Sequence, residues 1–377
     1  MAERESVSAW PLKVVSYLGG RSSGQEEMMQ YNYAILDPLS DQALGLKKLL
    51  KSCTQPVEVH AITSAEWTWL ERAVVRMIYR RTIKLEEAIE RDFLVVPTGY
   101  RSTVDLIENV PDVANRLSLS DRMLEVADKE SMLDRADNLG YKTPRRLCLE
   151  ELKAGKYSGP IFYKELTEQG GGRRGTASSL MDLPDAGRGL LLEEVIGSAG
   201  TYGVAFFARD GRITSIAGHF ESVSTPSQGG SAVVIESYSD ERLKEFTAAL
   251  VADLEYSGWG LAEFKWSERV GEFVLMEING KLWASSEFSF RANPHLFFES
   301  FGLQLNQQSS KPGAAVYLHR VRDSGAAAGA LSALMRRRAL PLAYFPPIVF
   351  SLAAFLAKAR EGLLGHSTGR CKDDARQ

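Results

Sequence analysis

The chain has 377 residues, of which 44% are hydrophobic, so it is long enough to bury a core and to form two or three structural units. Its 45 basic and 48 acidic side chains nearly cancel, which excludes a general positive field that would recruit nucleic acid or an anionic membrane. The three cysteines, Cys53, Cys148 and Cys371, form no CxxC motif, and no charged-then-apolar signal segment opens the chain. We therefore expect a cytoplasmic protein without structural zinc.

The N-terminal third shows strand-like runs separated by mixed helical stretches. Residues 11–19 (PLKVVSYLG) predict a first strand, and residues 89–100 (IERDFLVVPTGY) predict another that ends in a Pro/Gly turn. From 119 to 144, apolar residues recur at helical spacing until Gly140, a C-cap glycine, and Pro144, a helix breaker. We place a domain boundary near residue 115.

Strands dominate from 159 to 279, with one helical interruption. The pattern SDERLKEFTAALVADLEYSG predicts a helix from about 239 to 256, with Ser239 or Asp240 as the N-cap and Gly258 at its end.

The stretch GLAEFKWSERVGEFVLMEINGK, residues 260–281, predicts a β-hairpin with its turn near 269–271. If the turn is symmetric about residue 270, Glu263 and Glu277 lie opposite each other, with Cβ atoms about 5 Å apart. Like charges so placed need a compensating cation, and with the oxygen of Asn279 on the same face they form a set that Mg²⁺ accepts. Lys281 could then reach an anionic group. The alternative is an amphipathic hairpin with both glutamates in solvent.

A glycine run follows another predicted strand. In GPIFYKELTEQGGGRRGTASS, Lys164 ends an apolar strand and residues 170–175 read GGGRRG, so backbone N–H groups and a lysine could bind phosphate. The run matches GxGxxG, but the segment 176–189 is too short for the helix of a dinucleotide site and is broken by Pro184. A solvated hairpin tip is the alternative. Protein-kinase HRD and DFG strings and a GxxxxGK[ST] motif are absent.

A third feature is GLLLEEVIGSAGTYGVAFF, residues 189–207. An apolar strand here runs into Glu193 and Glu194, which could offer backbone groups and one carboxylate to an adenine edge.

In this order, the segments resemble the ATP-grasp superfamily, whose members hold ATP between two α+β subdomains and activate a carboxylate as an acyl-phosphate for an amine. The segments that resemble motifs of this superfamily lie between about 115 and 300. They are ADKESMLDRADNLGYKTP, IFYKEL with GGGRRG, LLLEEVI, and AEFKW with MEINGK. The stretch from Glu277 onward is most similar to carboxylate-amine ligases related to the carbamoyl-phosphate-synthase large subunit. The resemblance implies an α/β plus α+β protein, an ATP-grasp fold behind an N-terminal Rossmann-like pre-ATP-grasp domain.

The resemblance also implies a division of the chain. Residues 1–114 would form the pre-ATP-grasp domain, 115–190 the subdomain with the central lysine and glycine-rich lid, and 191–320 the subdomain with the metal site. Residues 321–377 would form an apolar and basic helical extension.

The resemblance implies that the chain binds ATP together with Mg²⁺, with Mn²⁺ as the alternative metal ion. It also implies small-molecule carboxylate and amine substrates. The resemblance assigns residues to four roles: contact with ATP phosphates or the lid (Lys129, Lys164, Gly171, Gly172, Gly175), the adenine pocket (Glu193, Glu194, Ile196), the metal (Glu263, Glu277, Asn279), and the acyl-phosphate or another anion (Lys281, Arg291). The reaction needs no protein nucleophile, and His219 and His295 are expected to be structural or exposed.

Two positions depart from the family pattern. Gly200 stands where the resemblance would place an acid that binds the ribose, and Gly280-Lys281 follows the metal-site asparagine in place of proline and arginine. A nucleotide-binding regulatory protein without ligation is therefore the alternative function. An NAD-type oxidoreductase, based on the literal GxGxxG, is a third.

The C-terminal segment raises a separate question. Arg336 to Arg338 precede nineteen uncharged residues, 339–357, and prolines limit the predicted helix to about 347–363. Peripheral membrane contact through this helix is one hypothesis, and packing onto the core or a partner subunit is the other. The sequence leaves the oligomeric state open, a homodimer included.

Overall fold

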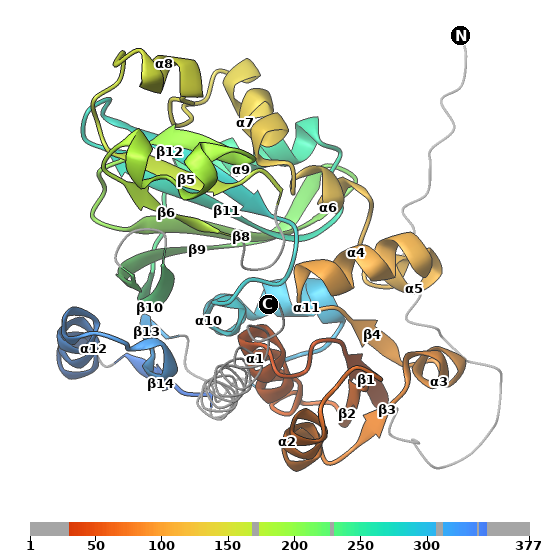
Figure 1. The fold of residues 1–377 in the computed structure, drawn as a ribbon. Coiled ribbons are helices and arrows are strands. Elements are labelled where there is room, and N and C mark those ends of the chain that lie inside the picture. Colours follow the sequence, from red (N-terminus) through yellow and green to blue (C-terminus); the bar gives the residue numbers. More distant parts are fainter. Residues whose placement is uncertain (1–29, 168–172, 227–229, 307–311, 338, 345–377) are drawn as a thin grey trace, which may run out of the picture.

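The computed structural model describes residues 30–167, 173–226, 230–306, 312–337 and 339–344. The strand predicted at 11–19, the helix predicted at 347–363, and Gly171 and Gly172 lie outside the described residues. Within the described residues, three sheets are present (Figure 1), and no helix is long and apolar enough to cross a membrane.

The N-terminal sheet is parallel, with strand order β3-β2-β1-β4. Its strands are β1 (Tyr31–Ile35), β2 (Val57–Ile62), β3 (Thr82–Ile83) and β4 (Leu94–Val96), and the strand expected within 89–100 is β4. Its helices are α1 (Asp41–Leu50), α2 (Trp69–Tyr79), α3 (Leu85–Glu90), α4 (Tyr100–Asn109) and α5 (Pro111–Asn115). The hydroxyl of the buried Tyr33 donates to the carbonyl of Phe301 over 2.6 Å, which ties this sheet to the rest of the core.

The helical pattern from 119 to 144 forms two helices rather than one. These are α6 (Arg122–Glu125) and α7 (Lys129–Asn138), separated where Asp128 takes extended geometry and its side chain accepts from the amide of Ser131. Gly140, with φ of +82°, follows the end of α7 as the sequence predicted.

A small antiparallel sheet follows, with strand order β6-β5-β7. Its strands are β5 (Ile161–Glu165), β6 (Arg174–Ala177) and β7 (Leu190–Glu194). The short helical elements of this part of the chain are α8 (Leu149–Lys153), η1 (Leu180–Asp182) and η2 (Pro184–Gly187). The glycine run connects two antiparallel neighbours, β5 and β6. The βαβ unit that a dinucleotide site requires is therefore not formed here.

The largest sheet has seven strands in the order β12-β11-β8-β9-β10-β13-β14. They are β8 (Thr201–Arg209), β9 (Arg212–Thr225), β10 (Ser231–Ser237), β11 (Gly258–Ser267), β12 (Glu272–Asn279), β13 (Ala314–Tyr317) and β14 (Leu340–Leu342). Helix α9 (Glu241–Asp253) begins after the N-cap Asp240 and packs on this sheet, where Phe246 meets Phe264. The helix ends five residues before Gly258, because Glu255 and Gly258 both have positive φ and Gly258 already begins β11.

The predicted hairpin is β11 and β12, and its register is confirmed. Glu263 pairs with Glu277, but a β-bulge makes Phe264 pair with Leu275, so that Met276 is an extra residue in β12. The hairpin is therefore symmetric about 270 only beyond the bulge, on the side of the glutamates.

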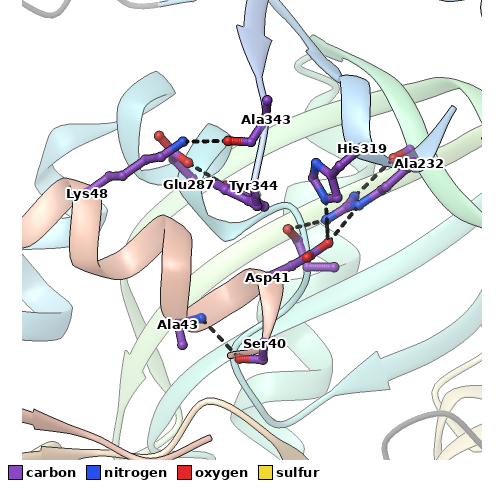
Figure 2. A network of polar contacts seen from close by, with 11 residues as sticks. Ser40, Asp41, Ala43, Lys48, Ala232, Glu287, His319, Ala343 and Tyr344 are labelled. Atoms are coloured by element: carbon purple, nitrogen blue, oxygen red, sulfur yellow. Dashed lines mark hydrogen bonds and ion pairs between the residues drawn. The ribbon is translucent and has the colours of Figure 1, made fainter. Parts of the chain in front are cut away.

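The helical elements after β12 are α10 (Ser286–Ala292), α11 (Pro294–Phe301), η3 (Leu318–Arg320) and α12 (Ser324–Arg337). Of these, α10 packs against α1. Strand β14 pairs in parallel with β13, so residues 340–342 extend the large sheet, where the sequence had suggested a helical extension. Asp41 of α1 accepts from His319, and Tyr344 donates to the buried Glu287 (Figure 2). Arg320 also donates to Asp41.

Candidate functional site

A cavity of about 1010 Å³ lies between the three-stranded and seven-stranded sheets. Its walls include Phe162 and Lys164 of β5 on one side and Glu263 of β11 and Glu277 of β12 on the other. The volume is at the upper end of the range for small-molecule sites, so a nucleotide and further substrates can fit together.

The two opposed glutamates form the electrostatic centre of the cavity. Burial, with the nearby carboxylates of Glu277 and Glu221, raises the pKa of Glu263 well above its usual range. The side-chain amide of Asn279 donates to Oε1 of Glu277 over 3.2 Å, and Nζ of Lys129 lies 3.9 Å from Oε2. Two carboxylates facing each other at this depth favour a cation between them.

The donor set fits a hard divalent cation. Two carboxylates and the amide of Asn279, all on the cavity wall, supply only oxygen, the ligand that Mg²⁺ prefers. Among the described residues, no three histidine, cysteine, aspartate or glutamate side chains gather as a metal cluster. A cation here would therefore complete its shell with water or ligand oxygens, as Mg²⁺ commonly does.

Lys164 faces this pair from β5 and is held by two contacts. Its Nζ donates to the carbonyl of Met276 over 2.9 Å and lies 3.1 Å from Oε2 of Glu193. Glu193 is fully buried and does not line the cavity, so it is the counter-ion of Lys164 and not a wall of an adenine pocket. The bulge at Met276 thus places an acceptor for Lys164 between the glutamate pair and the turn.

The segment after β7 forms one end of the cavity. Glu194 and Ile196 line it, together with the glycine-rich residues 197–200. Both oxygens of Glu194 accept from Nη2 of Arg269, at 2.7 and 2.9 Å, and the amide of Arg145 donates to Oε1 over 3.3 Å. The side chain of Glu194 is engaged within the protein, so the next residues of this segment, 195–197, line this end of the cavity beside it.

Known structures share this fold. No protein-family profile and no curated protein sequence matches the chain. Among solved structures, phosphoribosylamine–glycine ligase from Thermotoga maritima superimposes with a TM-score of 0.53 and 13% identity, over 73% of this chain and 76% of the ligase. Biotin carboxylase from Campylobacter jejuni, in its beta-gamma-ATP complex, gives 0.51 and 14%, over 73% of each chain. The chain has the ATP-grasp fold.

A further match is pyruvate carboxylase from Rhizobium etli, with a TM-score of 0.51 and 16% identity. It covers 74% of this chain, which spans only 30% of that enzyme. At these identities the likeness concerns the fold alone.

Within the ATP-grasp fold, several of the expected residues come together and others do not. The cavity wall contains Lys129, Lys164, Glu194, Ile196, Glu263, Glu277, Asn279 and Lys281. Arg291 is not on this wall, because its guanidinium donates twice to the buried Glu287, at 2.8 and 3.0 Å, so its expected role as an anion contact is wrong for this structure. Gly175 is in β6 beneath the ring of Tyr163, which leaves no room for a Cβ.

Several charged residues of the wall were not predicted from the sequence, among them Lys265 and Glu221. Lys265 lies two residues after Glu263 on the same strand face, and its side chain has no hydrogen bond or ion pair with the described residues. Burial lowers its pKa, against the attraction of Glu263. Glu221 of β9 lines the cavity further along the sheet. Strand alternation from Glu263 could have identified Lys265, but the neighbours of Glu221 depend on the strand order.

Proposed function

We propose that the protein is an ATP-dependent ligase that activates a carboxylate as an acyl-phosphate and joins it to an amine. The proposal is carried by one observation, the opposed pair Glu263 and Glu277 facing Lys164 across a cavity in an ATP-grasp fold. It is supported by the backbone of 195–197 at one end of the cavity, which suits the edge of a base. The finer role of each residue is part of the proposal.

In this proposal the position of each charged residue on the cavity wall determines which part of the substrates it would bind. Lys129 and Lys164 neutralise the phosphates of ATP, and Glu263, Glu277 and Asn279 would hold Mg²⁺, which supplies positive charge to the transferred phosphoryl group when bound. Lys281, on the same wall, would steady the acyl-phosphate as a point charge. Bound substrates filling the cavity would limit the access of water, which would otherwise hydrolyse that intermediate.

The bond changes balance without a protein nucleophile. A carboxylate oxygen of the first substrate bonds to the γ-phosphorus as the bond to ADP breaks. The nitrogen of the amine then bonds to the carbonyl carbon, inorganic phosphate leaves, and the amine loses a proton. The products are the amide, ADP and phosphate.

Regulatory nucleotide binding without ligation is the second candidate, and Gly200 favours it. A Cβ at Gly200 would lie 2.2 Å from the carbonyl oxygen of Glu221 and 2.7 Å from the ring of Phe220, so no acidic side chain fits there. Any ribose contact must come from elsewhere on the wall.

A screen for acyl-phosphate formation separates the two candidates. The purified protein is incubated with ATP, Mg²⁺, hydroxylamine and pools of carboxylic acids, and ADP and hydroxamate are measured. The ligase proposal predicts both products with at least one acid, and their loss in Glu277→Gln but not in Glu272→Gln, an exposed position of the same strand. Tight ATP binding without hydroxamate from any pool would favour the regulatory candidate.

A further inference from the structure

We propose that Glu221 binds the amine substrate as its ammonium ion, at the end of the cavity formed by β9 and β10, and that His219 positions the Glu221 carboxylate. This inference rests on the proposed ligase function and names the class of its second substrate, a basic primary amine.

The sheet register places the site beside the glutamate pair. Glu263 pairs with Gly203 of β8, and Gly203 pairs with His219 of β9. These residues therefore form a row on the cavity face of the sheet, and Glu221 lies two residues further along β9 on the same face. Glu221 is close enough to raise the pKa of Glu263, which places the two carboxylates near each other.

The Glu221 carboxylate lines the cavity and has no hydrogen-bond partner among the described residues. The residue is 9% exposed, and its nearest cationic candidate is Nε2 of His219, 3.7 Å from Oε1. That distance is beyond hydrogen-bond reach. A carboxylate placed in this way can accept a hydrogen bond from a ligand in the cavity.

The ring of His219 is a second buried polar group beside Glu221. Its ring is 1% exposed, and neither ring nitrogen has a hydrogen-bond partner in the described part of the chain. The ring occupies the space above Gly203, where a Cβ would lie 2.1 Å from Nε2. A polar ring buried over a glycine, with Nε2 toward Glu221, is an arrangement that a bound ligand or its water would complete.

The charge on the surrounding wall favours a cation. Arg320 also lines this end, but its guanidinium is fully engaged, since it donates to Asp41 and to the carbonyls of Ala232 and Ala284. Asp323 adds a second carboxylate to the same wall. It has no ion pair with the described residues but accepts from the amide of Ala326 over 2.8 Å and from the hydroxyl of Thr225 over 3.5 Å. Because Arg320 is paired with Asp41, the carboxylates of Glu221 and Asp323 make this end of the wall acidic.

The wall also has room for more than ammonia. The cavity wall that includes Glu221 also contains several small residues: Ser222, Ser224, Ser231, Ala232, Ala284 and Ser285. A primary amine with a carbon chain, such as an amino acid or a diamine, fits the space and the charge. In the ligation step the ammonium first gives one proton to solvent and becomes the neutral amine. Its nitrogen then bonds to the acyl-phosphate carbon, the bond to phosphate breaks, and the nitrogen loses a second proton, to the departing phosphate or to solvent, as the amide forms.

The test compares a charged amine with hydroxylamine, which is neutral near pH 7. With the acid that gives hydroxamate in the wild type, ADP release is measured against a panel of amino acids and diamines, and the fastest is kept as the probe. Glu221→Gln is expected to raise the KM of that amine about 10- to 100-fold, with the KM of ATP and the rate with hydroxylamine unchanged. Arg212→Gln, at the exposed start of the same strand and away from the cavity wall, should change none of these values.

His219 is tested as a positioning residue. His219→Phe, which keeps the ring volume, is expected to raise the amine KM by a smaller factor than Glu221→Gln and to leave kcat with hydroxylamine intact. His219→Gln, which keeps a donor, should restore most of the amine KM. Equal effects of Glu221→Gln on hydroxylamine and on the charged amine would overturn the inference, as would a wild type that uses hydroxylamine but no charged amine. A wild type that forms no hydroxamate at all would instead contradict the ligase proposal.

Discussion

Glu263 and Glu277 face each other across β11 and β12 because Met276 is an extra residue in β12. Without the bulge, the register of the turn would pair Glu263 with Met276, and the side chains beyond it would exchange faces of the sheet. The bulge has a second effect, since the carbonyl of Met276 accepts from Lys164. One inserted residue therefore sets both the carboxylate pair and the lysine that faces it.

Replacing Glu263 by glutamine should stabilise the protein without Mg²⁺. Burial and the carboxylates of Glu277 and Glu221 raise the pKa of Glu263 above 4.5, while Arg174 lowers it. Because the folded-state pKa is above the unfolded one, ionisation opposes folding, and stability falls as the pH rises from about 4.5 toward the folded pKa. Glu263→Gln should therefore melt at a higher temperature than wild type at pH 7 in EDTA.

The pH dependence of the difference in melting temperature between Glu263→Gln and the wild type provides a control. The gain should shrink toward pH 4.5 and below, where the wild-type carboxyl is already protonated. The exposed Glu272→Gln should show no such trend. A destabilised Glu263→Gln at pH 7 in EDTA would mean that the carboxylate is compensated by the protein.

Removing Lys164 should leave a costly buried charge. Glu193 is fully buried, and Lys164 is its ion-pair partner at 3.1 Å, so Lys164→Met is expected to lose about 3 to 5 kcal/mol of unfolding free energy. The double variant Lys164→Met/Glu193→Leu should recover most of that loss, because no unpaired charge remains. Urea unfolding measures both, and ATP binding should be weak in each. A single variant as stable as wild type would contradict the pairing.

A methyl group at position 203 should meet the His219 ring. A Cβ there would lie 2.1 Å from Nε2, so Gly203→Ala is expected to cost about 1 to 3 kcal/mol. In a double-mutant cycle with His219→Ala, the alanine at 203 should cost much less. Additive losses from the two changes would show that the ring does not occupy this space.

Replacing Lys265 by an uncharged residue should maintain or raise the stability of the protein and weaken its binding of ATP. Its ammonium is largely buried on the cavity wall, without a hydrogen bond or ion pair to the described residues, and burial lowers its pKa. Lys265→Met is therefore expected to be at least as stable as wild type without ligand but to bind ATP about tenfold more weakly. Lys265→Arg keeps the charge and serves as the control in calorimetry. Unchanged ATP affinity in Lys265→Met would place the nucleotide elsewhere.

Much of the fold could be predicted from local patterns. The alternation in 260–281 predicts the hairpin, and Asp240 and Gly140 mark helix ends where the structure has them. The break between α6 and α7 was missed, because the apolar spacing continues across Asp128 while the side chain of that residue caps the second helix.

The site was predicted where it depends on one hairpin and missed where it depends on tertiary contacts. The opposition of Glu263 and Glu277 follows from the strand pattern, although the symmetry about 270 holds only because of the bulge. Burial of Glu193 against Lys164 depends on the pairing of β5 with β7, which are distant in the sequence. The pair of Arg291 with Glu287 is local, at i,i+4 spacing on α10, and the spacing could have identified it. Glu221 joins the site only through the order of four strands.

The central claim is that Glu263 and Glu277 hold the metal through which the cavity binds ATP. Calorimetry of ATP binding with and without Mg²⁺ tests it most directly, on the wild type, Glu277→Gln and the exposed control Glu272→Gln. We predict Mg²⁺-dependent binding in the wild type and in Glu272→Gln, and loss of the Mg²⁺ dependence in Glu277→Gln. The same Mg²⁺ dependence in Glu277→Gln as in the wild type, or no ATP binding by the wild type, would contradict the account.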